Sequence, residues 1–81
     1  MDHVIVTNFE GHIALYRGPE LTTLIWEVLE TEFDLTPFEM ANPDSEFEPT
    51  LTEAIRNPSI TALADALAYL DIDMFHSGPQ E

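Results

Sequence analysis

The chain has 81 residues, including 16 acidic residues against two arginines, and its formal net charge is −14 at pH 7. This length holds one small domain, and a hydrophobic fraction of 44% supports a modest core. The charge argues against direct binding to nucleic acid or anionic membranes, which needs cations at the phosphates, and the lack of cysteine excludes disulfides, thiolate metal sites and cysteine nucleophiles.

The first predicted element is a β-hairpin over residues 3–17. Its arms, Val4–Thr7 and Ile13–Tyr16, are rich in β-branched and aromatic residues. Gly11 between them supplies the positive φ of a tight turn. The Gly18-Pro19 pair then closes the hairpin and opens a helix.

A helix is predicted from Pro19 to about Phe33. Its apolar residues recur at the spacing of one helical face: Leu21, Leu24, Ile25, Val28 and Leu29. Glu27, Glu30 and Asp34 share a different face. The last turn is crowded with carboxylates, although the helix dipole favours cations there. This cost in stability suggests that the charge is retained for another reason.

Three shorter helices follow. Thr36 is the predicted N-cap of the first, with Glu39 as its capping-box partner and Ala41 near its end. The second spans Pro49–Arg56, and the third runs from an N-cap at Ser59 to Leu70.

Residues Asp71–Phe75 alternate as a short strand does. A lone hairpin is marginally stable, so we expect this strand to join it as a third. Residues 76–81 are expected to form a flexible tail. The fold prediction is therefore a single α+β domain over residues 1–81, with an N-terminal β-hairpin, a third C-terminal strand and three to four short helices.

Residues 21–75 carry a further pattern. The stretch Leu35–Ala41, and the run from Arg56–Ser59 to Leu70–Asp73, resemble the helix-turn-helix domains of phage repressors and toxin–antitoxin regulators. The resemblance implies a partly helix-turn-helix-like fold. The stretch that matches the recognition helix holds a single cation, Arg56, together with Glu53. DNA readers present several cations there, so we expect DNA binding to be lost.

The stretch Gly18–Ile55 holds ten carboxylates and no Lys, Arg or His. In its charge, its size and its lack of lysine and cysteine the chain resembles small phage-encoded DNA mimics, including anti-CRISPR inhibitors. The resemblance implies carboxylates that imitate phosphates and block a nucleic-acid-binding site. Residues four apart on a helix rise about 6 Å, which suits a row of such mimics.

We therefore expect a partner-binding surface on a basic nucleic-acid-processing protein, such as a CRISPR effector complex. Its predicted residues combine carboxylates with two aromatic anchors: Glu27, Glu30, Glu32, Asp34, Glu39, Asp44, Glu46, Glu48, Glu53, Trp26 and Phe47. Two alternatives stay open: a helix-turn-helix-derived regulator or antitoxin that acts through protein contacts, and an acidic domain adapted to high salt. Homodimerisation through the hairpin edge is also left open.

No catalytic motif is present: the sequence lacks a Gly-rich phosphate loop, a His-Glu-x-x-His motif and a Ser-His-Asp order. The run Asp44–Glu48 lacks the glycine of a calcium loop. The sequence leaves open that His3 and His12 face one another across the hairpin, but two imidazoles alone make a weak metal site, so exposed strand histidines are favoured. We expect no enzyme activity, metal or cofactor.

Without a secretion signal or a bilayer-length apolar run, a cytoplasmic location is expected, in the bacterial host if the protein is phage-encoded.

Overall fold

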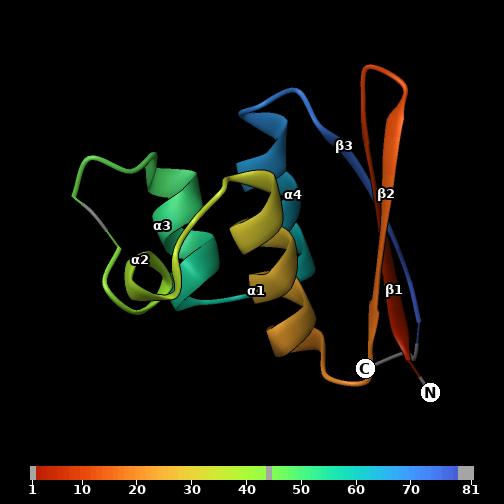
Figure 1. Ribbon diagram of the computed structural model, residues 1–81, viewed down its shortest axis with the longest axis horizontal. Helices are drawn as coiled ribbons and strands as arrows, with labels where there is room; N and C mark the ends of the chain where they lie inside the picture. The colour runs from red at the N-terminus through yellow and green to blue at the C-terminus, as the bar shows by residue number, and fades with distance from the viewer. Residues whose placement is uncertain (1, 44, 79–81) are drawn as a thin grey trace.

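The fold is a three-stranded sheet with four helices on one of its faces (Figure 1), described by a computed structural model for residues 2–43 and 45–78. The elements in chain order are β1 (His3–Phe9), β2 (His12–Gly18), α1 (Leu21–Glu32), α2 (Pro37–Ala41), α3 (Pro49–Arg56), α4 (Ile60–Ala68) and β3 (Asp73–Ser77). The strand order is β2-β1-β3, and both pairings are antiparallel. The predicted α+β class is confirmed, including the third strand.

The hairpin turns through two residues, Glu10 and Gly11, because Phe9 pairs with His12. Both turn residues have positive φ, 50° for Glu10 and 87° for Gly11, as a type I′ turn requires. The Gly11 amide donates a hydrogen bond to Asn8 Oδ1 at 3.0 Å. The predicted role of Gly11 is confirmed, but Glu10 takes a left-handed conformation that suits glycine or asparagine better.

The third strand has the predicted length but begins and ends two residues later than predicted. β3 pairs with β1 from Asn8, opposite Asp73, to Val4, opposite Ser77. His76 therefore belongs to the sheet and not to a flexible tail, because the main-chain ladder continues past Phe75. The remainder of the predicted tail includes residues 79–81, which lie outside the described residues.

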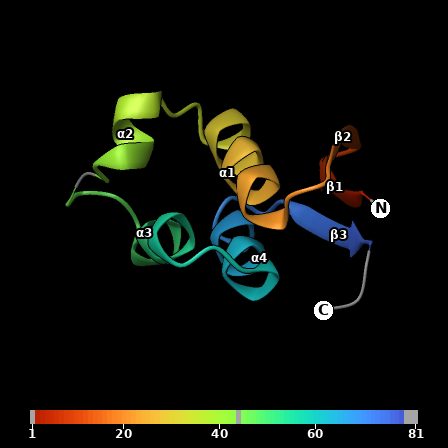
Figure 2. The same ribbon diagram turned by 90° about the horizontal axis from the view of Figure 1, so that it is seen from below.

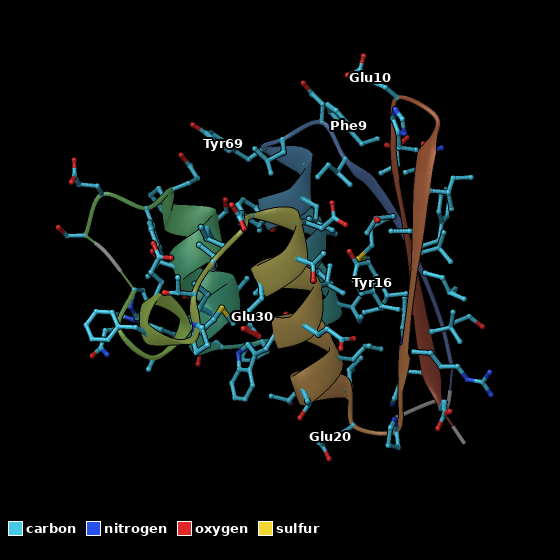
Figure 3. The ribbon with its side chains drawn as sticks, viewed as in Figure 1. Phe9, Glu10, Tyr16, Glu20, Glu30 and Tyr69 are labelled. Carbon is cyan, nitrogen blue, oxygen red and sulfur yellow. The ribbon has the colours of Figure 1, made fainter. Side chains whose placement is uncertain are left out.

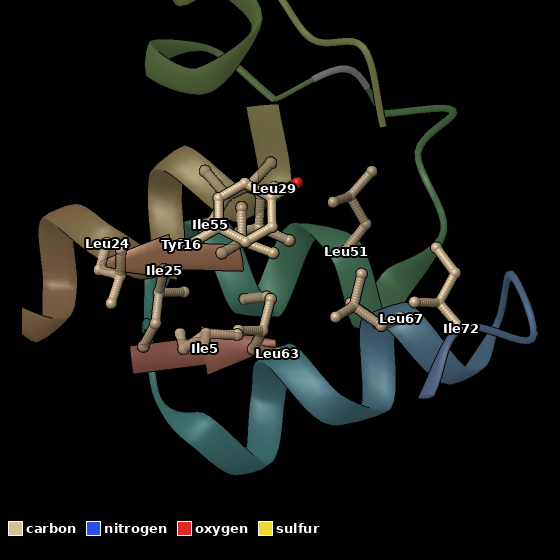
Figure 4. Packing of buried hydrophobic residues seen from close by; sticks show 13 residues of the cluster. Ile5, Tyr16, Leu24, Ile25, Leu29, Leu51, Ile55, Leu63, Leu67 and Ile72 are labelled. Atoms are coloured by element: carbon tan, nitrogen blue, oxygen red, sulfur yellow. The ribbon is translucent and has the colours of Figure 1, made fainter. Parts of the chain in front are cut away.

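The helices form two layers beside the sheet. α1 and α4 lie against it, and α2 and α3 lie on their far side (Figure 2). α1 begins at Leu21 with Glu20 as its N-cap, two residues later than predicted. Figure 4 shows how its apolar stripe meets the sheet and α4. The largest side chains in this core that are fully buried are those of Ile5, Ile25, Val28, Leu29, Leu63 and Leu67.

Local signals place the shorter helices where they were predicted. The Thr36 hydroxyl accepts from the Glu39 amide at 3.1 Å and Glu39 accepts from the Thr36 amide at 2.9 Å, a complete capping box. Ser59 caps α4 by accepting from the Ala62 amide at 3.0 Å. α3 has the predicted bounds, while α4 ends two residues before Leu70.

The resemblance to helix-turn-helix domains stays a prediction. α2 and α3 are separated by residues 42–48, which is longer than the three- or four-residue turn of that motif. α2 buries none of its side chains, and Phe38 on it is 74% exposed. Its capping box and the partly buried side chain of Met40, which packs against the core, hold this short helix.

The strained turn residue generates a stability prediction. Replacing Glu10 by Asn should raise the free energy of unfolding by about 0.5–1 kcal/mol, because Asn tolerates positive φ better than Glu. Glu10→Gln is the matched control, since it removes the same charge and keeps an unfavourable side chain in the turn. Urea unfolding followed by circular dichroism measures both variants. Equal stability of the two would show that charge, and not backbone strain, is relieved.

Candidate functional site

Four carboxylates line the solvent face of α1 and its two ends: Glu20, Glu27, Glu30 and Asp34, here called the acidic stripe. They share this face because α1 turns its apolar side to the sheet and α4. Helical geometry separates Glu27 from Glu30 by about 4.5 Å along the axis. Glu30 is half-buried and the other three are exposed. In Figure 3, Glu20 marks the start of α1 and Glu30 lies on the side away from the sheet.

Asp34 ends α1 in a conformation that normally favours glycine. Its φ is 54°, and the following Leu35 amide bonds back to the Glu30 carbonyl at 2.9 Å, as in a Schellman cap. Its charge also lies at the negative end of the helix dipole. In the described part of the chain, the residues other than glycine with positive φ are Glu10, Asp34 and Asp71, all of them acidic. Carboxylates thus occupy these positions at a cost to stability.

Glu32, a predicted partner-binding residue, points instead toward the sheet. Its carboxylate accepts hydrogen bonds from the Tyr16 hydroxyl and, at 3.2 Å, from the Thr7 hydroxyl. Figure 3 shows Tyr16 between α1 and the sheet. Burial, and then the neighbouring Glu32 carboxylate, raise the pKa of Tyr16 well above its ordinary value. Glu32 therefore anchors α1 and is not part of the acidic stripe.

An apolar groove of about 390 Å³ borders the stripe between α1 and α2. It is lined by Trp26, Glu30, Pro37, Met40 and Ala41. Trp26 is 39% exposed, and its indole Nε1 donates to the Ile55 carbonyl at 3.0 Å. This bond fixes the ring at the wall of the groove, so a rigid aromatic surface lies beside the negative charge.

The other predicted site residues in the described part of the chain belong to α2, to α3 and to the segment between them. Glu39 is held in the capping box, Glu48 is the N-cap of α3, and Glu53 accepts from the Asn57 side chain at 3.2 Å. Glu46 is exposed, and Phe47 is half-buried against the core. Asp44 lies outside the described residues.

The groove residues Pro37, Met40 and Ala41 were missed by the sequence analysis. The only sequence signal for them was the predicted short helix, α2. Its distance from Trp26 depends on how α2 packs, which the sequence does not show. The facing of His3 and His12 that the sequence left open does not form, because the hairpin register puts them at opposite ends. His3 Nδ1 lies 3.1 Å from His76 Nε2 instead. The favoured interpretation of exposed histidines was wrong for His3, which is buried. Within the described residues, no cluster of three or more metal-ligating side chains is formed.

Comparison with known proteins gives no relative for this chain. No family model matches it, and neither curated proteins nor solved structures give a match. Among the described residues, each helix is too short or too polar to cross a lipid bilayer.

The cap of α1 generates a prediction with a matched control. Asp34→Gly should stabilise the protein by about 1 kcal/mol, because glycine tolerates the left-handed conformation and the substitution removes an acid from the helix end. Asp71→Gly relieves a similar conformation after α4 and should stabilise similarly. Thermal unfolding at neutral pH measures the stability of both variants. An Asp34→Gly variant less stable than the wild type would contradict the proposed cost of the aspartate at this position.

The Tyr16 hydroxyl generates a pH prediction. Because its pKa is higher in the folded than in the unfolded chain, its stabilising contribution is complete below about pH 10 and is lost as the pH rises above it. Tyr16→Phe should cost about 1.5–3 kcal/mol at neutral pH and reduce the alkaline loss. Tyr69→Phe, at an exposed position, is the control. Urea unfolding at neutral and alkaline pH tests this, and an unchanged alkaline slope in Tyr16→Phe would refute it.

Proposed function

We propose that this protein is a non-catalytic inhibitor that binds a basic nucleic-acid-binding site on another protein through the acidic stripe. Its most concrete form is an anti-CRISPR protein that blocks DNA binding by a CRISPR effector complex. The observation that carries the proposal is the row of carboxylates on the outer face of α1 without an interspersed cation. A single-sign surface of this kind steers a basic partner into contact.

The two arginines leave this surface negative. Arg17 lies on β2 and bonds to Asp2 at 3.0 Å, and Arg56 lies at the end of α3. Neither belongs to α1 or α2, the elements that form the stripe and the groove. A basic channel that normally holds phosphates would therefore meet several carboxylates at helical spacing.

The groove supports the proposal through a second kind of contact. Rim charges mainly set the rate and specificity of association, whereas a desolvated aromatic such as Trp supplies much of the affinity. Trp26 lies next to Glu30 in the same groove. A basic site with an apolar side chain at its border fits this combination.

The apolar lining of the groove also favours the alternative of a regulator or antitoxin that binds one partner by hydrophobic contact. The two functions differ in their dependence on salt. Binding through the stripe weakens as salt screens exposed charges, whereas binding through the groove does not.

The test is inhibition of DNA binding by purified CRISPR effector complexes, measured with labelled target DNA at low and moderate salt. We expect at least one complex to lose DNA binding when the protein is added, and added salt to weaken that inhibition. Pull-down from bacterial lysate with elution by DNA extends the search to other nucleic-acid enzymes. A partner that survives high salt and ignores DNA would favour the antitoxin alternative.

Charge reversal locates the site. Replacing Glu27, Glu30 and Asp34 by Lys should weaken inhibition at least tenfold, which corresponds to about 1.4 kcal/mol.

The matched control reverses Glu10, Asp65 and Asp71, three exposed acids outside the stripe. It changes the net charge equally and also includes an aspartate with positive φ. Equal loss in both triple variants would show that net charge alone matters. Unfolding of the wild type at low salt and folding only in molar salt would favour salt adaptation instead.

A further inference from the structure

The sheet face that points away from the helices is apolar and exposed. The register places Val4, Val6, Ile13, Leu15 and Phe75 on it, here called the outer sheet face. Ile13 is 69% exposed, Leu15 66% and Phe75 63%. The four helices all lie on the other side of the sheet in both ribbon views (Figures 1 and 2). An apolar surface of this kind marks an interaction site.

The arrangement of this face resembles that of a protein interface. Leu15, Val6 and Phe75 lie side by side across the three strands and form its centre. Charged groups lie at two corners. Arg17, which bonds to Asp2, lies beside Val4, and Asp73 lies beside Asn8 at the diagonally opposite corner. An apolar centre with a polar rim is the usual anatomy of a specific interface.

We propose that two copies of this chain associate through their outer sheet faces and form a two-fold symmetric dimer with stacked sheets. The opposite charges at two corners of the face, Arg17 and Asp73, fit a second copy as the occupant. With a net charge of −14, two copies repel one another through their acidic surfaces, whereas this face carries few charges of mixed sign. A two-fold axis across the diagonal brings Arg17 of each copy opposite Asp73 of the other, so the face is complementary to itself.

The area of the face sets the strength of the dimer. Two strands of seven residues and one of five, about 4.8 Å apart and rising about 3.3 Å per residue, cover roughly 300 Å² of flat sheet per copy. Two such faces together cover about 600 Å², well short of the about 1,000 Å² that specific interfaces bury. The dimer is therefore reversible, with a dissociation constant in the micromolar range or weaker. Its formation does not depend on the proposed inhibitory function.

Sedimentation equilibrium from micromolar to millimolar protein tests the proposal. We expect a concentration-dependent monomer–dimer equilibrium that added salt strengthens, because salt screens the repulsion between two acidic copies. Target binding through the acidic stripe has the opposite salt dependence, so failure of one proposal is distinguishable from failure of the other. A monomer at every concentration would overturn the proposed dimer and would indicate that a different protein binds the outer sheet face.

Two aromatic substitutions provide the matched pair. Phe75→Ser should weaken dimerisation at least tenfold, because it removes an apolar side chain from the centre of the face. Phe38→Ser removes a similarly exposed phenyl ring on α2 and should leave the equilibrium unchanged. Circular dichroism checks that both variants fold. Equal weakening by the two would overturn the assignment to the outer sheet face.

The corner charges test the two-fold pairing. Arg17→Asp places two acids opposite one another and should weaken the dimer severalfold. Adding Asp73→Arg to that variant restores opposite charges and should recover the dissociation constant of the wild type. A double variant as weak as Arg17→Asp would overturn this orientation of the two sheets.

Discussion

The packing of α1 against the inner face of the sheet, chiefly at β2, decides where the other features of this protein lie. Ile5 on β1 and the buried side of α1, including Val28 and Leu29, exclude water together. Once that side is fixed, the helical period turns Glu27 and Glu30 outward. The same rotation turns Glu32 inward, where the Tyr16 hydroxyl meets it. A single buried contact thus separates an anchoring carboxylate from those free to meet a partner.

This small protein combines a modest core with strong self-repulsion. Like charges destabilise the compact state, and Glu10, Asp34 and Asp71 add local backbone strain. A single substitution at one of these residues is enough to relieve its cost in folding stability. Their coexistence in one short chain fits selection for a charged surface more than selection for maximal stability.

Sequence signals that span only a few residues predicted the fold well. Contacts between residues far apart in the sequence could not be predicted. The capping box at Thr36 and the apolar period of α1 depend only on near neighbours. The contact of His3 with His76 and the groove beside Trp26 depend on register and on helix packing, which periodicity does not fix. Glu27 and Glu30 of the acidic stripe could be predicted because helical spacing alone aligns them. Glu20 was missed as a site residue, because it precedes the first turn of α1. The outer sheet face could not be predicted, since Phe75 joins it only when β3 pairs in its observed register.

The strand order has a kinetic consequence. β1 is the central strand, and its two neighbours come from opposite ends of the sequence: β2 follows at once, whereas β3 begins at Asp73. The hairpin can form locally within microseconds, but the second ladder must close a long loop that contains all four helices. Completion of the sheet therefore has to follow collapse of the helices, and the transition state for folding should already contain α1 and α4 packed on the hairpin.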